Sequence, residues 1–235
     1  MRPSTHLRAL LKQPGMLIAP GAYDGITARI IEQAGFPLVY MTGAGTSASL
    51  GFPDYGLVTM SEMVENAGIL ARSVKLPVIS DADTGYGNEL NVTRTVREFE
   101  SRYVAGIHIE DQVAPKRCGH LDGKEIEPLD KYVSKIRAAV AARRDPDFLI
   151  IARTDCRASM GFEEAIRRAN ASLEAGADMV FVEAPQMPLY DEKAVQERLN
   201  SYEVPKQVLC LPSFIKTPSA KIDTLKTVAL YLNSI

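Results

Sequence analysis

Residues 76–88 read LPVISDADTGYGN and join a short apolar run to an acidic turn that contains two glycines. The run shows no alternation of apolar and polar residues, which is typical of a parallel strand buried on both faces. The same order of apolar run, polar turn and helical stretch recurs along the chain. The apolar runs are MLIAP (16–20), PLVYMTG (37–43), LPVISDADT (76–84), GIHIEDQ (106–112), FLIIARTD (148–155) and DMVFVEAP (178–185), with two weaker runs, QVLCL (207–211) and TVALYL (227–232).

Amphipathic stretches separate these runs and predict helices between the strands. This alternation implies right-handed βαβ crossovers, and about eight such units favour a closed (β/α)8 barrel of the TIM type. No G-x-G-x-x-G follows the first run and no linker divides the chain, so we expect a single α/β-barrel domain over residues 1–235. The expected apolar helix faces are Ile26, Ile30 and Ala34, then Met60, Met63, Ala67 and Leu70, and then Ala165, Ala169 and Leu173.

The composition excludes several other classes of protein. The chain has 27 Lys and Arg against 29 Asp and Glu, so its charge gives no reason to expect nucleic acid or an anionic membrane as the main partner. No run reaches the ~18–20 apolar residues that span a bilayer, and the N-terminus lacks the apolar core of a secretory signal. Three cysteines are too few for a disulfide scaffold, so we expect a cytoplasmic location.

Polar side chains gather where the apolar runs end, and in a parallel barrel these ends share one mouth. So many carboxylates would repel one another unless a cation were present. Asp81 and Asp83 point to the same side of an ideal strand, and Glu110 is a reasonable third member of a site for Mg²⁺, with Mn²⁺ as an alternative. A competing interpretation is that these acids cap helices or are solvated. The polar ends are Thr42-Gly43, Asp81-Ala82-Asp83, Glu110-Asp111, Arg153-Thr154-Asp155 and Glu183.

Residues 116–120, KRCGH, place one thiol among cationic side chains. Such neighbours favour the thiolate, so Cys118 can be a nucleophile or a general acid/base, and Gly119 suits a mobile loop. The alternatives are an ordinary basic loop with a passenger cysteine, or a zinc site, for which Cys156 and Cys210 have unsuitable spacing. The small residues 42–47, TGAGTS, predict a turn whose N–H groups approach an anion. His6 and His108 need no function.

These motifs resemble the isocitrate lyase/phosphoenolpyruvate mutase superfamily, whose signature K-[KR]-C-G-H is matched by KRCGH. The resemblance covers roughly residues 5–186 and points to the short lyase branch, which includes methylisocitrate lyase-like, dimethylmalate lyase-like and oxaloacetate hydrolase-like members. The other matching segments are PGAYDG (20–25), TGAGTSAS (42–49), FPDYG (52–56), DADTGYGN (81–88), HIEDQ (108–112), IARTD (151–155) and EAP (183–185).

The resemblance implies a barrel with a swapped last helix, in dimers or tetramers, and a role for each matching residue. Asp83 would contact Mg²⁺ directly, and Asp81 and Glu110 would act mainly through water. Thr42, Gly43 and Ala44 would bind the keto-acid carboxylate, Arg153 would hold a substrate carboxylate, and Asp54 would lie near the reacting oxygen. Cys118 and Gly119 would belong to a gating loop. The other residues that would line the site are Tyr40, Lys116, Arg117, His120 and Glu183.

The implied activity is a Mg²⁺-dependent carbon–carbon lyase acting on a small-molecule carboxylate. A 2-hydroxy di- or tricarboxylate would split into pyruvate or a related keto acid and a carboxylic acid, with Cys118 as general acid. Oxaloacetate hydrolysis to oxalate and acetate is the alternative, and phosphonate chemistry is disfavoured because such members typically lack the Cys motif. A third hypothesis is a degenerate, non-catalytic homologue. It rests on the C-terminus, where Pro212 or Ser213 replaces the family's Asn and the barrel is expected to lack its usual swapped helix.

Overall fold

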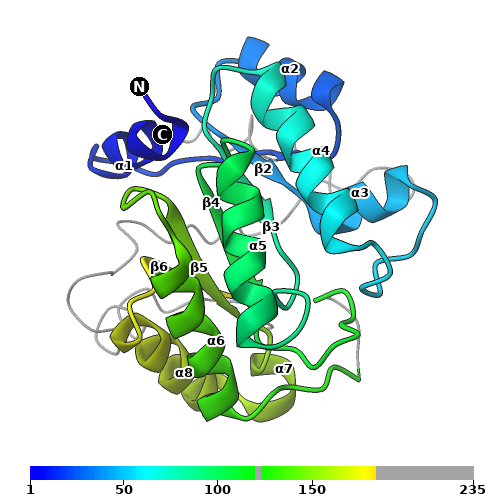
Figure 1. The fold of residues 1–235 in the computed structure, drawn as a ribbon, viewed down its shortest axis with the longest axis vertical. Coiled ribbons are helices and arrows are strands. Elements are labelled where there is room, and N and C mark those ends of the chain that lie inside the picture. The colour runs from blue at the N-terminus through cyan, green and yellow to red at the C-terminus, as the bar shows by residue number, and fades with distance from the viewer. Residues whose placement is uncertain (120–122, 184–235) are drawn as a thin grey trace, which may run out of the picture.

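The computed structural model describes residues 1–119 and 123–183 (Figure 1). The two weak apolar runs, the closure of the barrel and the expected loss of the last helix all lie outside these residues. Six strands form one parallel sheet in the order β1-β2-β3-β4-β5-β6, as expected for successive βα units. They are β1 (Gly21–Ala22), β2 (Val39–Met41), β3 (Val78–Asp81), β4 (Gly106–Glu110), β5 (Leu149–Thr154) and β6 (Met179–Val182).

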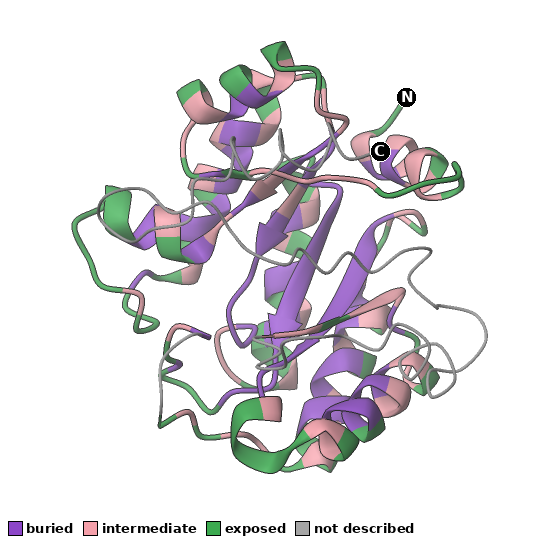
Figure 2. Ribbon diagram, turned by 180° about the vertical axis from the view of Figure 1, so that it is seen from behind, coloured by how far each residue is buried: buried purple, intermediate pink, exposed green. Residues whose placement is uncertain are grey.

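Helices cover the outer face of this sheet, where Figure 1 shows α5 and α6 in front of the strands. Every residue of β4 and β5 is buried, which confirms strands covered on both faces. Figure 2 shows that the exposed residues lie mainly on the outer sides of the helices and in loops. The helices are α1 (Pro3–Leu11), α2 (Gly25–Gln33), α3 (Gly43–Ser49), α4 (Met60–Ser73), α5 (Glu89–Ser101), α6 (Leu129–Ala142), α7 (Arg157–Met160) and α8 (Phe162–Glu174).

Three of these helices begin at a reciprocal side-chain cap that the sequence encodes. The carboxylate of Asp24 accepts a hydrogen bond from the Thr27 N–H at 2.7 Å and starts α2. Thr59 and Asn88 cap α4 and α5 in the same reciprocal way. These caps satisfy N–H groups that have no partner inside the helix, so each crossover helix starts at a defined residue.

Helix α1 covers the end of the sheet where the strands begin. Leu7 packs in a small apolar cluster with Leu38 and Leu149. Arg8 pairs with Asp178 at 2.7 Å. The opposite edge, at the carboxyl ends of the strands, therefore remains for function. No helix in the described part of the chain is long and apolar enough to cross a membrane.

Three local predictions from the sequence are wrong. Residues 16–20 are not a strand; the first strand pairing begins at Gly21, after Pro20, which lacks an N–H to donate. The small-residue segment after β2 is not a turn but the helix α3, because Thr42 caps it by accepting from the Gly45 N–H at 3.3 Å. In α2, Ile26 and Ile30 are 71% and 58% exposed.

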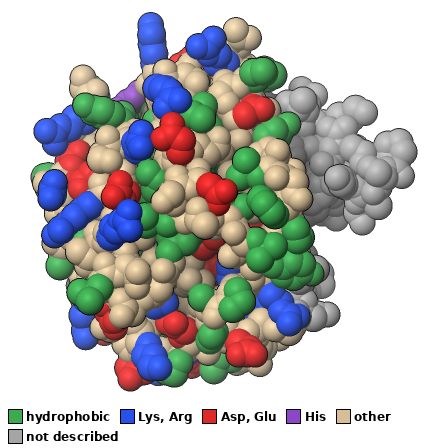
Figure 3. Space-filling view, turned by 45° about the vertical axis from the view of Figure 1, so that its right-hand side comes forward, with side chains coloured by type: hydrophobic (Ala, Val, Ile, Leu, Met, Phe, Trp, Pro, Cys, Tyr) green, Lys and Arg blue, Asp and Glu red, His purple; other side chains and the backbone are tan. Residues whose placement is uncertain are grey.

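The buried residues of α2 are instead Ala28 and Ile31, because α2 packs against α4 through that side of the helix. The apolar faces predicted for α4 and α8 are confirmed except at Met60 and Leu173, which are half-buried. Met63, Ala67 and Leu70 of α4 are buried, as are Ala165 and Ala169 of α8. The surface view in Figure 3 shows acidic and basic side chains side by side over the visible face.

Candidate active site at the carboxyl ends of the strands

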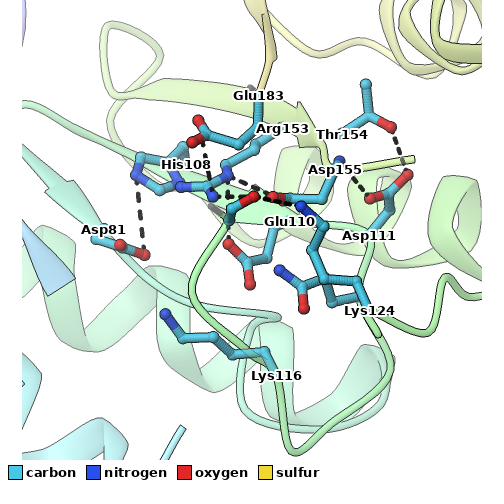
Figure 4. A network of polar contacts seen from close by, with 12 residues as sticks. Asp81, His108, Glu110, Asp111, Lys116, Lys124, Arg153, Thr154, Asp155 and Glu183 are labelled. Atoms are coloured by element: carbon cyan, nitrogen blue, oxygen red, sulfur yellow. Dashed lines mark hydrogen bonds and ion pairs between the residues drawn. The ribbon is translucent and has the colours of Figure 1, made fainter. Parts of the chain in front are cut away.

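The strand register brings the predicted polar residues together at one edge. Asp81 of β3 lies beside His108 of β4, and Glu110 of β4 lies beside Arg153 of β5. Glu183 follows β6, and its N–H donates to the Thr154 carbonyl at 2.9 Å. Figure 4 shows these side chains converging from neighbouring strands.

A tyrosine–histidine pair forms one wall of the site. The Tyr40 hydroxyl lies 2.9 Å from Nε2 of His108, and the two rings are stacked. The same nitrogen lies 3.8 Å from Oδ1 of Asp81. Burial lowers the pKa of His108 to about 4, so the imidazole is neutral near pH 7. Burial also raises the pKa of Tyr40, which therefore remains a phenol.

His108, for which the sequence predicts no function, lies between the site residues Tyr40 and Asp81. His108 precedes Glu110 by two residues on one strand, so both side chains lie on the same side of the sheet. That spacing was the signal in the sequence.

The two aspartates of the DADTGYGN segment are both buried but ionise differently. Oδ1 of Asp81 accepts a hydrogen bond from the Asp83 N–H at 2.9 Å. Burial, and then the charge of Asp81, raises the pKa of Asp83 to about 6. For Asp81 burial also opposes ionisation, but the charges of Lys116 and Arg153 and the hydrogen bond from the Asp83 N–H outweigh it and lower the pKa to about 2. A side chain at Gly43 would collide with the Asp81 carboxylate, so only glycine fits there.

Glu110 is the least satisfied acid of the site. It is fully buried, and its two carboxylate oxygens accept no hydrogen bond from any described residue. Its ion-pair partner is Arg153, whose Nε lies 3.3 Å from Oε2. Burial raises the pKa of Glu110, and Arg153 opposes that rise. A buried acid with unfilled acceptors indicates a place for a cation or for ordered water.

Arg153 is held in a fixed position by its neighbours. Its Nε and Nη2 each lie 3.0 Å from the Asp155 carboxylate, which makes a two-pronged pair. Glu183 lies 3.7 Å from Nη2. The ring of Phe181 lies 5.2 Å from the guanidinium. Although burial opposes the charge, Glu110 and Asp155 raise the pKa of Arg153, so the guanidinium stays charged.

The loop that carries KRCGH lies over these groups. Lys116 Nζ lies 2.5 Å from Asp54 and 3.0 Å from Asp83. The half-buried Cys118 donates its N–H to the Asp54 carbonyl at 3.1 Å. A Cβ on the buried Gly119 would lie 2.5 Å from Nη2 of Arg153, so the loop touches the arginine directly.

Other candidate residues are less closely engaged. The Arg117 side chain is exposed, while its backbone is held by Gln112 through two hydrogen bonds of 2.9 Å. Ala44 is exposed, although it lies in the first turn of α3 beside Gly43, where helix N–H groups lack partners within the helix. His120, like Pro212 and Ser213, lies outside the described residues.

The three acids of the site carry the type of ligand atom that Mg²⁺ prefers. The side chains of Asp81, Asp83 and Glu110 offer only oxygen ligands. Both carboxylate oxygens of Glu110 lack a hydrogen-bond donor among the described residues, so they are available to a cation or to its bound water. Within residues 1–119 and 123–183, however, no three His, Cys, Asp or Glu side chains come close enough to hold an ion together. The residues therefore fit a hydrated Mg²⁺ bound largely through water, and they do not fit a site of three direct protein ligands.

A buried network behind Arg153 was not predicted from the sequence. Asp111 accepts hydrogen bonds from the Thr154 hydroxyl at 2.6 Å and from the Asp155 N–H at 2.8 Å. Arg168 of α8 lies 3.2 Å from Asp111 and 2.9 Å from Glu164. The signal was an arginine on the otherwise apolar face of a helix. Asp155 orients Arg153, and Asp111, Thr154 and Arg168 hold Asp155 in place. We call these four residues, Asp111, Thr154, Asp155 and Arg168, the brace.

Comparisons with known proteins identify the family of this chain. Residues 7–228 match the phosphoenolpyruvate phosphomutase family. The chain is 49% identical to the 2,3-dimethylmalate lyase of Eubacterium barkeri over 209 residues, which are 88% of this chain and 72% of that protein. It is also 49% identical to the 2-methylisocitrate lyase of Aeropyrum pernix over 225 residues, which cover 96% and 71% of the two chains.

Solved structures give the same picture. An oxaloacetate acetylhydrolase in complex with 3,3-difluorooxalacetate matches with a TM-score of 0.80 and 41% identity, covering 86% of this chain and 71% of that chain. A phosphonopyruvate hydrolase in complex with oxalate and Mg²⁺ matches with a TM-score of 0.78 and 34% identity, covering 86% and 70%. The chain belongs to the phosphoenolpyruvate phosphomutase family, within the PEP mutase/isocitrate lyase superfamily.

Proposed function

We propose that this protein is a Mg²⁺-dependent carbon–carbon lyase. Its substrate is a branched 2-hydroxy di- or tricarboxylate of the 2,3-dimethylmalate or 2-methylisocitrate type, and its products are pyruvate or a related keto acid and a carboxylic acid. One observation carries the proposal: the loop with Cys118 lies over the acids and Arg153 through the contacts of Lys116 and Gly119. The similarity to two lyases of this superfamily supports the same reaction class.

The substrate carboxylates would be held at two separate places. The first turn of α3, with Thr42, Gly43 and Ala44, presents N–H groups to the keto-acid carboxylate. Arg153 faces the other carboxylate with a guanidinium that Asp155 has already oriented. Because the guanidinium is fixed before substrate arrives, little order is lost on binding.

Asp83, with Asp81 and Glu110 through water, would hold the cation. When bound, Mg²⁺ would polarise the oxygen on which negative charge develops, and Mn²⁺ suits the same oxygen ligands. The neutral pair of Tyr40 and His108 stands beside this place and adds no charge to it.

The proton balance of the reaction then uses the chain's own groups. The substrate hydroxyl would give its proton to the Asp54 carboxylate as the carbon–carbon bond breaks, and the electron pair of that bond would stay on the carbon next to the second carboxylate. The Cys118 thiol would give that carbon its proton as general acid, and the proton released from Asp54 would restore the thiol through solvent after the products leave. The loop that carries Cys118 excludes water while the carbanion exists. Lys116, Arg117, His120 and Glu183 would complete the polar lining.

The direct test is turnover of each hydroxy acid with Mg²⁺, followed by coupled detection of the keto acid. We expect Cys118→Ser to lose about 10²–10⁴-fold in kcat, the range for loss of a general acid. The matched control is Cys156→Ala, because Cys156 is a fully buried thiol just before α7 with no proposed role in the reaction, and its loss should change kcat little. A folded wild-type protein that cleaves neither acid would contradict the substrate assignment.

Oxaloacetate hydrolysis is the second candidate, favoured by the match to an oxaloacetate acetylhydrolase. Release of oxalate from oxaloacetate, measured under the same conditions, decides between the two activities. The alternative of a non-catalytic homologue would be favoured by two results together. Mg²⁺ would not raise the melting temperature of the wild type, and Cys118→Ser would behave like the wild type. The cytoplasmic location and the dimeric or tetrameric state stay predictions.

A further inference from the structure

The turn at residues 83–87 is strained and firmly anchored. Asp83 has a φ of 46° and Tyr86 a φ of 62°, a region that residues other than glycine seldom adopt. The Thr95 hydroxyl of α5 donates to the Gly85 carbonyl at 3.1 Å, and Lys135 of α6 donates to the Thr84 carbonyl at 3.4 Å. Two helices therefore hold a conformation that places both the Asp83 carboxylate and the Tyr86 ring.

The hydroxyl of Tyr86 is a buried polar group that the reaction has not used. It has no hydrogen-bond partner in the described part of the chain. Burial raises the pKa of Tyr86, and the charges of Asp83, Asp81 and Glu110 raise it further. The group therefore stays a phenol, able to donate one hydrogen bond and to accept another, close to the three candidate acids. Buried hydroxyls normally form a hydrogen bond, so the unpaired Tyr86 hydroxyl indicates that its hydrogen-bond partner is a molecule other than this chain's described residues.

A cavity of about 500 Å³ lies beside this turn, and the buried Tyr86 oxygen lies behind its wall. Asp83, Tyr86 and Lys116 share its wall with the loop segments 56–60 and 114–115. A water occupies about 30 Å³ of liquid volume, so several waters fit, and the wall supplies polar groups to hold them. The cavity thus connects the Tyr86 side chain with the acid and the lysine that meet at the proposed cation site.

We infer that Tyr86 is a positioning residue for the hydrated cation: its hydroxyl, buried behind the cavity wall before the cation binds, accepts a hydrogen bond from a cation-bound water. Mg²⁺ keeps several of its waters, and a water bound through its oxygen can only donate its hydrogens outward. The Tyr86 oxygen is an acceptor without a partner, and its own hydrogen is left to donate to a second water or to an acid. This inference rests on the proposed Mg²⁺ dependence and adds a residue to it.

The test compares Mg²⁺ binding of the wild type and of Tyr86→Phe, by calorimetric titration and by thermal unfolding with and without MgCl₂. The metal-free variant should melt at the wild-type temperature or above it, because it loses only an unpartnered hydroxyl. Its Mg²⁺ dissociation constant should rise about tenfold or more, the usual effect of losing a partner of the coordination shell. Tyr103→Phe is the matched control, since Tyr103 has a φ of 61° but is 72% exposed.

Each outcome separates the two proposals. If Mg²⁺ neither binds nor stabilises the wild type, the cation site itself fails, and the role of Tyr86 fails with it. If the wild type binds Mg²⁺ and Tyr86→Phe binds it equally well, the role of Tyr86 is overturned alone. A metal-free variant that melts clearly below the wild type would show that the hydroxyl already has a protein partner, and would also overturn it. A loss of affinity in Tyr86→Phe with an unchanged Tyr103→Phe supports the inference.

Discussion

The two halves of this site bury charge in opposite ways. On the β5 side, Arg153, Asp155, Asp111 and Arg168 form a network in which each charge meets an opposite charge or a hydrogen-bond donor. On the β3–β4 side, both oxygens of Glu110 accept no hydrogen bond within the described residues. The first half is complete as it stands, whereas the second leaves acceptors for an added cation or ordered water. We therefore propose that the first half orients the substrate and that the second binds the metal.

The largest effect on stability is expected from breaking the complete half. Asp155→Ala removes the two-pronged partner of a buried guanidinium, and loss of one member of a buried ion pair costs about 3–5 kcal/mol. Urea unfolding of the metal-free protein measures this. The control is Arg167→Ala, which removes an exposed pair with Glu164 and should cost about 1 kcal/mol or less. Equal losses of unfolding free energy in the two variants would show that the pair of Arg153 with Asp155 contributes no more stability than an exposed ion pair.

A pH titration should sharpen the contrast from the metal side. The pKa of Asp83 is raised from 3.8 to about 6, so its carboxylate is charged above pH 6 and takes up a proton as the pH falls below that value. A proton and Mg²⁺ compete for the same carboxylate. The Mg²⁺ dissociation constant, measured by calorimetry between pH 5 and 8, should be flat above about 6.5 and rise by up to about tenfold per unit below 6.

Asp83→Asn is the control for this titration. It should bind Mg²⁺ weakly at every pH, because the amide cannot be charged. A wild-type dissociation constant that stays constant from pH 5 to 7 would exclude Asp83 as the titrating ligand.

Much of the fold and of the site could be predicted because the determining signals are local. Continuous apolar runs without alternation mark the strands β2 to β6, and the polar residues that end them lie at the shared edge, as Asp81, Glu110 and Arg153 do. Caps such as Asp24 with Thr27 define helix starts within four residues of sequence.

What the sequence did not reveal depends on tertiary partners. The apolar stripe of Ile26 and Ile30 is exposed because contact with α4, and not periodicity, decides which side of α2 is buried. The position of His108 in the site could not be predicted, because nothing in the local sequence shows that Tyr40, far away in the chain, stacks against it. Arg168 was overlooked because its carboxylate partner Asp111 is 57 residues away.

The measurement that tests the unequal halves most directly is the stability and Mg²⁺ binding of Glu110→Gln. In the metal-free protein we expect a change within about 1 kcal/mol of the wild type, because the lost carboxylate accepts no hydrogen bond from the described residues and its ion-pair partner Arg153 keeps both hydrogen bonds to Asp155. The stabilisation by saturating MgCl₂ should fall sharply in the same variant, since the charge that attracts the cation is gone. A metal-free loss of about 3–5 kcal/mol, like that expected for Asp155→Ala, together with undiminished stabilisation by Mg²⁺, would contradict the assignment of this half to the cation.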